Sequence, residues 1–396
     1  MTGARKIFIV DPQPSTQIIC LADAMAVEFD CQVIFLVSSL SVRIYIPPRF
    51  KAYNISQLKY LSEQKQLDFF EGVLFCMLYN DLRQINVDNK VFFDRYNIPC
   101  LFVERGFFRG TFCQADWQGC NSRSSFAERG QGAFIYSRKQ LDNIFRIKNN
   151  ERPINRAITT FFVRLQFIIF LIAASIEDIA LGSKISRRMG VTGYAKQFYR
   201  SFFGRRRWEH ITAQSKLPSI TLFLQLESDT QFLNNGIYGS NEDLVVEFLQ
   251  LAKYKDFNPI IITHPNEVSD LSYLKAIGFN PGKLKKSTEG RFLALNSTAI
   301  FENFLQGNLC CTVLKTWYSY AFEVPAKLTL PNSVDYLLRD NAISRRPAMK
   351  IENLEEVFFS GSLPGDLLDR NHELANLAAK ILKESLAKQV HRNRKS

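Results

Sequence analysis

Three short apolar runs in the second half of the chain each end abruptly in polar residues. They are SITLFLQL before Glu227, PIIIT before His264 and RFLAL before Asn296. Each run is long enough for one buried strand, and each is followed by a helix-like pattern. Because parallel strands end at the same edge of a sheet, we expect these polar residues to gather there, where α/β proteins bind ligands.

The first 150 residues also alternate between strand and helix patterns. The predicted strands are KIFIV (6–10), CQVIFLV (31–37), GVLFCML (72–78) and PCLFVE (99–104). The predicted helices cover residues 16–29, 56–65 and 81–96. This alternation is typical of βαβ units, so it predicts a second parallel sheet.

Between the two alternating regions, residues 151–215 have no strand pattern and are predicted to be helical. The alternation resumes at Leu217, continues through LCCTVL (309–314), and ends in helical patterns at 352–359 and 366–389. We therefore predict an α/β protein with a Rossmann-like domain at 1–150, a helical connector at 151–215 and a second Rossmann-like domain at 216–396. Two such domains with a cleft between them make the GT-B architecture of many glycosyltransferases.

Composition and charge narrow the class of partner. The net charge of +12 favours an anionic partner, but no nucleic-acid-binding module is recognisable, so we expect no nucleic acid. The eight cysteines include no CxxC pair and no histidine at zinc spacing, which favours buried free thiols in a reducing compartment over disulfides or a metal. The apolar stretch before Asp11 is too short for a signal peptide, so a cytoplasmic protein is predicted.

Residues 157–182 are strongly apolar, and their uncharged core between Arg164 and Glu177 is 12 residues long. A spanning helix needs about 20 apolar residues, so no transmembrane helix is expected. A basic stretch rich in aromatic residues follows, through Arg207 and Trp208. It fits a peripheral contact with anionic lipid headgroups, and it fits equally a buried helix followed by a solvated basic face.

Polar residues with useful chemistry follow several of the predicted strands. Glu104 is placed at the carboxyl end of its strand, and Arg109 can reach an anion from the glycine-containing turn that follows. Asp229 and His264 follow neighbouring strands, and a carboxylate near an imidazole can serve as nucleophile or base. Each of these residues also has an ordinary structural interpretation.

The segment NSTAIFENFLQG (296–307) is the sharpest single motif. Its residues Asn296, Ser297 and Thr298 are suited to begin a helix, whose free backbone N–H groups can bind a phosphate. Glu302, one turn into that helix, can accept hydrogen bonds from a ribose. An ordinary capped helix explains the same pattern, so the motif is weak on its own.

Taken in order, FVERGFFRG, DWQGCNSRSS, LQLESDTQF, THP and NSTAIFENFLQG resemble the capsule polysaccharide synthesis proteins of the KpsS and LipB type. The resemblance runs from about residue 99 to 320. It implies a retaining β-Kdo transferase of GT-B fold that uses CMP-Kdo as donor and starts a Kdo linker on lyso-phosphatidylglycerol, or extends a Kdo-terminated lipid. It also implies a Gram-negative bacterium, a peripheral place on the cytoplasmic face of the inner membrane and contacts with other capsule assembly proteins.

The resemblance assigns roles to individual residues. Glu104, Asp229 and His264 match the functional acid, acid and histidine of the family, and either carboxylate can be the nucleophile; we favour Asp229. The residues expected to bind substrate or nucleotide are Asn296, Ser297, Thr298, Glu302, Arg109, Asn121 and Gln225. No metal or cofactor is expected. The alternatives are another nucleotide sugar, such as CMP-sialic acid, another acceptor, or a non-catalytic component of capsule polysaccharide export.

Overall fold

The computed structural model divides the chain into two compact units, and each is treated separately below. Unit 1 comprises Met1–Ser125, Tyr136–Arg187 and Asn353–Ser396, and unit 2 comprises Phe126–Ile135 and Arg188–Glu352. The described residues are 5–10, 16–38, 43, 46–63, 67–79, 84–105, 112–119, 165, 168–169, 172–173, 175–176, 207–210, 216–227, 232, 237–264, 272–282, 290–305, 308–316, 324–339, 359–360, 375–376, 379–380 and 382–387.

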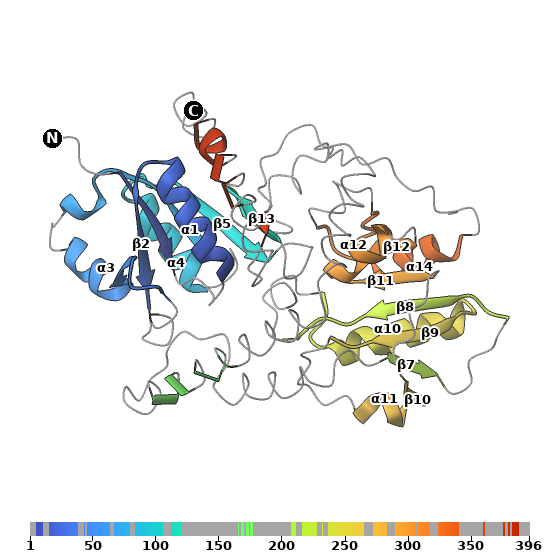
Figure 1. Cartoon of the computed structure of the whole chain (residues 1–396). Helices are drawn as coiled ribbons and strands as arrows, with labels where there is room; N and C mark the ends of the chain where they lie inside the picture. Colours follow the sequence, from blue (N-terminus) through green and yellow to red (C-terminus); the bar gives the residue numbers. More distant parts are fainter. Residues whose placement is uncertain are drawn as a thin grey trace. The chain divides into compact units, whose positions relative to one another are not determined.

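Unit 1 contains a mixed sheet whose parallel strands follow the Rossmann order (Figure 1). Its strands are β1 (Lys6–Val10), β2 (Gln32–Val37), β3 (Lys51–Asn54), β4 (Val73–Tyr79), β5 (Cys100–Arg105), β6 (Phe112–Asp116) and β13 (Phe359–Ser360). The sheet order is β13-β6-β5-β4-β1-β2-β3. Strands β1 to β5 are parallel, whereas β6 and β13 are antiparallel to their neighbours. The strand order reverses between β1 and β4.

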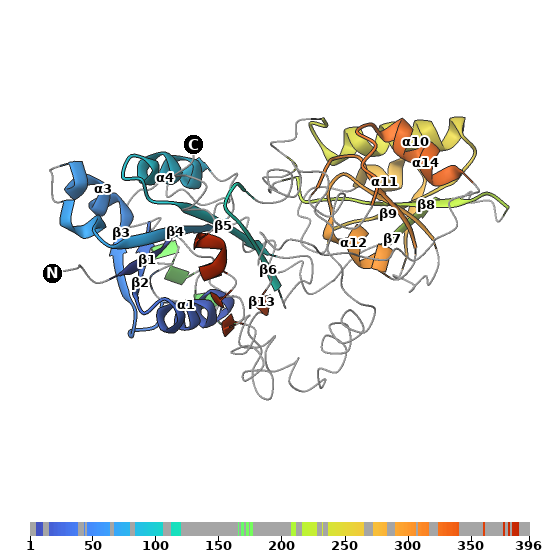
Figure 2. The same cartoon turned by 90° about the horizontal axis from the view of Figure 1, so that it is seen from above.

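Helices cover both faces of this sheet, because its central strands are apolar on both sides. The helical elements are α1 (Thr16–Glu28), α3 (Ile55–Glu63), the 3-10 helix η1 (Leu67–Phe70) and α4 (Gln84–Asp94). Figure 2 shows α1 on one face and α3 and α4 on the other. Alternate residues of β1 divide accordingly: Ile7 packs in the core with α1, and Phe8 packs in the aromatic core beneath α4.

Short turns return the chain from helix to strand at three equivalent places. Asp30 follows α1, Asn97 follows α4 and Asp256 follows α10 (Asn241–Tyr254) of unit 2, and all three have positive φ. Aspartate and asparagine tolerate this left-handed conformation better than other residues with a side chain. Each of these residues stands two or three positions after the last residue of its helix, where the chain turns toward the next strand.

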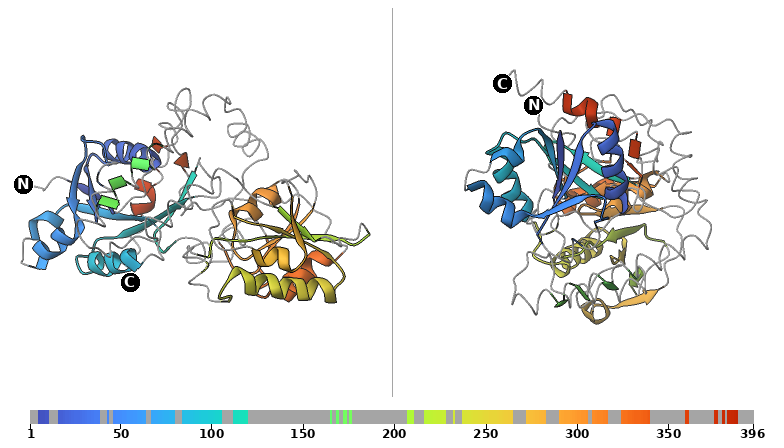
Figure 3. Two further views of the ribbon diagram at one scale, coloured as in Figure 1. Left: turned by 90° about the horizontal axis from the view of Figure 1, so that it is seen from below. Right: turned by 60° about the vertical axis from the view of Figure 1, so that its left-hand side comes forward.

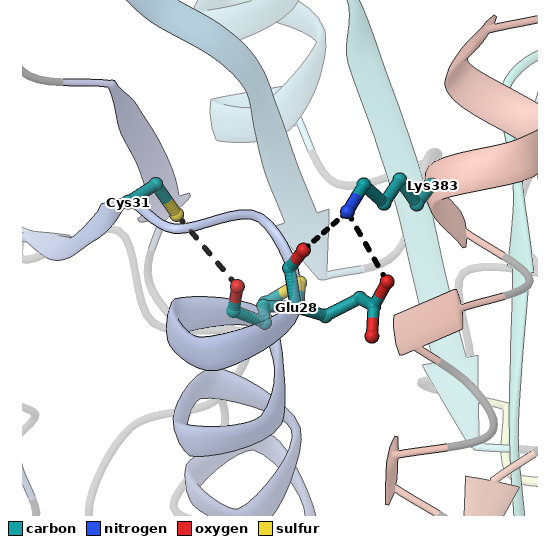
Figure 4. Close-up of polar contacts among 4 residues, drawn as sticks. Glu28, Cys31 and Lys383 are labelled. Atoms are coloured by element: carbon teal, nitrogen blue, oxygen red, sulfur yellow. Dashed lines mark hydrogen bonds and ion pairs between the residues drawn. The ribbon is translucent and has the colours of Figure 1, made fainter.

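The described end of the chain completes unit 1. Ala375, Ala379 and Leu382 are fully buried in the core that also contains α1. Lys383 Nζ donates to the backbone oxygen of Glu28 at 2.6 Å and lies 3.2 Å from its carboxylate, which places a cation at the C-terminus of α1 (Figure 4). The prediction that residues 216–396 form one domain was therefore wrong at its C-terminal end.

Unit 2 contains the second sheet, with the order β10-β7-β9-β8-β11-β12. Its elements are β7 (Arg207–His210), β8 (Ser219–Phe223), α10 (Asn241–Tyr254), β9 (Asn258–Ile262), α11 (Ser272–Ala276), β10 (Phe279–Gly282), β11 (Arg291–Ala294), α12 (Thr298–Leu305), β12 (Leu309–Thr312) and α14 (Leu330–Leu338). Strands β9, β8, β11 and β12 are parallel neighbours, and β7 and β10 form an antiparallel margin.

The core of unit 2 lies mainly between the sheet and the pair α10 and α14. Leu222 of β8 and Leu293 of β11 pack there with Phe248 of α10 and Leu337 of α14. On the opposite face of the sheet the rings of Phe223 and Phe292 stack, with their centroids 5.7 Å apart. Helix α12 lies on that side of the sheet (Figures 2 and 3). Unit 2 is therefore also a three-layer α/β arrangement.

The predicted α/β class with parallel sheets is confirmed, and so is the expectation that the three opening runs are parallel strands of one sheet. Two local predictions were wrong. Residues 207–210 form a strand inside the expected helical connector, and its Trp208 is 2 % exposed, so this aromatic residue is part of the core. Phe359 lies in β13 rather than in a helix, where it pairs with Cys113 of β6. Strands of two to four residues carry too little periodicity to be recognised.

Candidate functional site

The site is built at one edge of the second sheet, where its parallel strands end; we call this the carboxyl edge. Strand β8 is followed along the chain by β9 on one side of it, and then by β11 on the other side. The strand order therefore reverses between β8 and β11. In open α/β sheets this reversal opens a crevice at the carboxyl edge, because the connections leave toward opposite faces.

Gln225 and Asn296 meet at this reversal. Phe223 of β8 pairs with Ala294 of β11, so continuing the register by two residues brings Gln225 beside Asn296. The Gln225 side-chain nitrogen Nε2 donates to the backbone oxygen of Asn296, which joins the ends of the two strands. The other amide atom of Gln225, Oε1, is buried and finds no hydrogen-bond donor among the described residues. Gln225 can therefore offer an acceptor to a ligand, and it is unsuited to bind a phosphate oxygen.

The first turn of α10 donates hydrogen bonds to the loop that follows β8. Asn241, which is fully buried, donates from Nδ2 to the backbone oxygen of Gln225 at 2.8 Å. Its backbone N–H donates to Glu227 Oε1 at 2.7 Å, so the carboxylate lies at the positive end of the helix. Ser240 caps the same helix by accepting from the N–H of Asp243 at 3.1 Å. Glu227 thus has a structural role in this loop.

Ser297 begins α12 as its N-cap residue. Its hydroxyl accepts from the N–H of Ala299 at 3.3 Å, and its backbone oxygen accepts from the N–H of Ile300 at 2.9 Å. Two of the early amides of α12 are therefore used within the cap. Asn296 and Ser297 are 7 % and 8 % exposed, so only a small part of either residue is open to a ligand.

Two more strands end at the same edge. Ile262 of β9 pairs with Phe223 of β8, so the same register count brings His264, which is half-buried, to the level of Gln225. Beyond β11, strand β12 is followed by Lys315, which is exposed. Sequence reasoning missed Lys315. Its position directly after the LCCTVL run, which was recognised as a strand, was the available signal, and a lysine there adds positive charge near the cap of α12.

The structure brings only some of the predicted site residues together. Gln225, Asn296 and Ser297 lie side by side, with His264 at the end of the neighbouring strand. Thr298 is the first residue of α12 and Glu302 lies within it, although their side chains are not among those described. Asp229, Arg109 and Asn121 lie outside the described residues.

Glu104 lies in unit 1, as the penultimate residue of β5, so its predicted place at the carboxyl end of that strand is confirmed. It pairs in register with Gln114 of the antiparallel strand β6. The reversal of strand order in this sheet lies elsewhere, between β1 and β4. There Asn86 of α4 donates from Nδ2 to the backbone oxygen of Tyr79, the last residue of β4.

Within the described ranges, no group of three or more histidine, cysteine, aspartate and glutamate side chains is arranged to hold a metal ion. In the same part of the chain, no helix is both long enough and apolar enough to span a bilayer. A comparison with models of known protein families finds no match, and a comparison with curated proteins finds none either.

Proposed function

We propose that the protein is a glycosyltransferase of capsule biosynthesis that transfers Kdo from CMP-Kdo, with retention, to a lyso-phosphatidylglycerol or Kdo-terminated lipid acceptor. One observation carries the proposal furthest: Gln225 and Asn296, both chosen from sequence motifs, join the two strands between which the strand order of the second sheet reverses. The crevice at such a reversal is the usual nucleotide site of an open α/β sheet. The resemblance of the sequence motifs to capsule synthesis proteins supports the choice of donor.

In this proposal the second sheet binds the nucleotide. The N-terminus of α12 and Lys315 favour the phosphate, because a helix N-terminus and a cation both stabilise negative charge. The buried Oε1 of Gln225 accepts from a hydroxyl or amine of the nucleoside. His264 stabilises the departing phosphate from the neighbouring strand.

The chemistry assigned to the carboxylates is a double displacement. Asp229 attacks the anomeric carbon of Kdo, the bond from that carbon to the phosphate oxygen breaks, and CMP leaves with the electron pair. Glu104 then removes the proton of the acceptor hydroxyl, whose oxygen attacks the same carbon and releases Asp229. The two units are, in this proposal, the two domains of a GT-B enzyme that acts on the cytoplasmic face of the inner membrane.

The direct test is to incubate the purified full chain with CMP-Kdo and a lyso-phosphatidylglycerol analogue. We expect CMP release and an acceptor heavier by one Kdo, measured by mass spectrometry. Transfer from another nucleotide sugar only would point to a different donor. No CMP release with any donor would favour a non-catalytic export component and contradict the proposal.

Replacing Asp229 with Ala should lower transfer by roughly a thousandfold or more, since the variant lacks the carboxylate that this proposal assigns to the covalent adduct. CMP binding, measured by calorimetry, should be retained. Glu242→Ala is the matched control, because it removes an exposed carboxylate from α10 of the same unit. Full transfer by the Asp229 variant would refute the assigned nucleophile.

A further inference from the structure

Five aliphatic side chains form an exposed face on one helical segment of unit 1; we call this face the apolar stripe. It consists of Leu165, Ile168, Ile169, Ile172 and Ile176, which are 41 % to 58 % exposed. All five residues are helical, as are Ala173 and Ser175 between them. Among the described residues, no other element exposes so many large aliphatic side chains.

Helical geometry places these five residues on a single face. At about 100° per residue they project within an arc of roughly 100°. Ala173 and Ser175 project on opposite sides of that arc, and both are half-buried. The stripe therefore points outward, and Ala173 and Ser175 on its two sides are less exposed than the stripe itself.

An apolar stripe of this width normally packs against the core. Helix α10 of unit 2 follows that rule, because Leu244, Val245 and Phe248 are fully buried. Contiguous exposed aliphatic surface marks a site of interaction with a partner or a membrane. The stripe needs a partner that accepts aliphatic side chains.

The charge of the surrounding sequence indicates which partner fits. Residues 165–176 contain no charged residue, whereas residues 151–207 contain eleven Lys or Arg and three Asp or Glu. This stretch therefore carries eight of the twelve net positive charges of the protein. Arg164 precedes the stripe, and Glu177 and Asp178 follow it, so the charge that complements a bilayer with anionic headgroups is the net charge of +12 of the whole protein.

We propose that the apolar stripe binds the surface of an anionic lipid bilayer, with its side chains among the upper acyl chains and its helix in the plane of the membrane. A helix of twelve residues is about 18 Å long, and the hydrocarbon core is about 30 Å thick, so a segment of the length from Leu165 to Ile176 is too short to span it. The stripe contains no Tyr, Trp or Arg, the residues that dominate the binding energy of protein interfaces. This inference goes beyond the proposed sugar transfer and does not depend on it.

The test is co-sedimentation of the full chain with vesicles, without any sugar donor. One vesicle population is phosphatidylcholine alone, and the other contains phosphatidylcholine with phosphatidylglycerol. We expect at least about tenfold stronger binding to the anionic vesicles, weakened by high salt. The variant Ile168→Ser/Ile169→Ser/Ile172→Ser should bind the anionic vesicles at least about tenfold more weakly. Each change removes aliphatic groups that the bilayer buries when the protein binds.

The matched control is Val27→Ser/Ile237→Ser/Val246→Ser, which removes three exposed aliphatic side chains outside the stripe. It should bind as the wild-type protein does. Ile172→Trp adds a second readout, because its fluorescence should shift to shorter wavelength only with anionic vesicles. Equal binding by the stripe variant, no binding by the wild-type protein, or an unshifted Ile172→Trp spectrum overturns the proposal. So does light scattering that shows a wild-type dimer which the stripe variant converts to monomer, since a second copy then covers the stripe.

Discussion

The two sheets have the same kind of hydrogen bond at the point where their strand order reverses. In unit 1 the Asn86 amide donates to the last carbonyl of β4, and in unit 2 the Gln225 amide donates to the carbonyl just past β11. Both contacts lie where the strand order reverses. Yet Asn86 and its helical neighbour Asn89 are almost fully buried above an apolar core, whereas Gln225 lies beside Ser297 with His264 at the end of the next strand.

This difference shows that the strand order determines where a crevice forms. The residues after the strands determine which ligand can bind in it. An amide that donates to a strand end stabilises the sheet in both units. Among the described residues of unit 2, those that follow β9, β11 and β12 include an imidazole, a helix cap and a lysine. We therefore expect the two amides to be equivalent for stability and unequal for nucleotide binding.

The two units also differ in which parts of the chain build their cores. The largest expected effect on stability follows from this difference. Unit 1 is completed by Leu382, far along the chain, whereas the described elements of unit 2 follow one another from β7 to α14. Leu382→Ala should lower the free energy of unfolding of unit 1 by about 2–5 kcal/mol, because it leaves a cavity beside α1. Hydrogen exchange should then accelerate in α1 and stay unchanged in α10.

The matched control is Leu337→Ala, which makes the same cavity in unit 2 beneath α14. Its hydrogen exchange should accelerate in α10 and α14 and leave α1 unchanged. Faster exchange in both units from either variant would mean that they unfold together. That outcome would contradict the independence of the two cores.

The second test compares the two amides directly. Gln225→Met and Asn86→Leu preserve side-chain size and remove the donor, so each should cost about 1–3 kcal/mol of unfolding free energy. Gln225→Met should in addition weaken CMP binding by about tenfold in calorimetry, since the nucleoside loses its acceptor. Asn86→Leu should leave the CMP affinity within about twofold. Equal loss of affinity in both variants would remove the functional distinction between the sheets.

The smallest expected effect is alkaline destabilisation, shared by the two units. Burial raises the pKa of the Cys31 thiol in unit 1 and of the Cys311 thiol in unit 2 to about 11, above the ordinary value of 9.0. Because the folded state favours the neutral thiol, this stabilisation is complete below pH 9 and is lost as the pH rises toward 11. Urea midpoints measured from pH 8 to 11 should fall less steeply in Cys31→Ser and Cys311→Ser variants.

A urea midpoint that stays constant above pH 9 in the wild-type protein would contradict the raised thiol pKa values. The two variants also separate the units. Cys31→Ser should flatten the profile of unit 1 and leave that of unit 2 unchanged, as followed by hydrogen exchange in α1 and α10. The reverse pattern is expected for Cys311→Ser.

Much of the fold follows from local patterns in the chain. The apolar runs that become β1, β2, β4, β5, β8, β9, β11 and β12 are recognisable because each has three or more apolar residues between polar boundaries. Strands β3, β6, β7, β10 and β13 were missed, since they are short and each begins with a charged or aromatic residue. Their pairing with other strands of the sheet, rather than their own apolar pattern, makes these segments strands.

The candidate site divides in the same way. Gln225, His264, Asn296 and Ser297 were identifiable because each follows a recognisable apolar run. Lys315 follows such a run too, and it was missed because a single lysine has no motif. The role of Glu227 could not be predicted, since its contact is with the first amide of a helix that begins 14 residues later.

The sequence by itself determined which segments are central strands, where their polar ends lie and where an apolar, uncharged stretch interrupts a basic region. Those properties depend on neighbours along the chain. The tertiary structure alone decided that β8 lies between β9 and β11, that the C-terminal residues around Leu382 pack in unit 1, and that the stripe from Leu165 to Ile176 points outward. Strand order, helix docking and exposure all depend on which distant surfaces bury one another, and local periodicity carries no record of that choice.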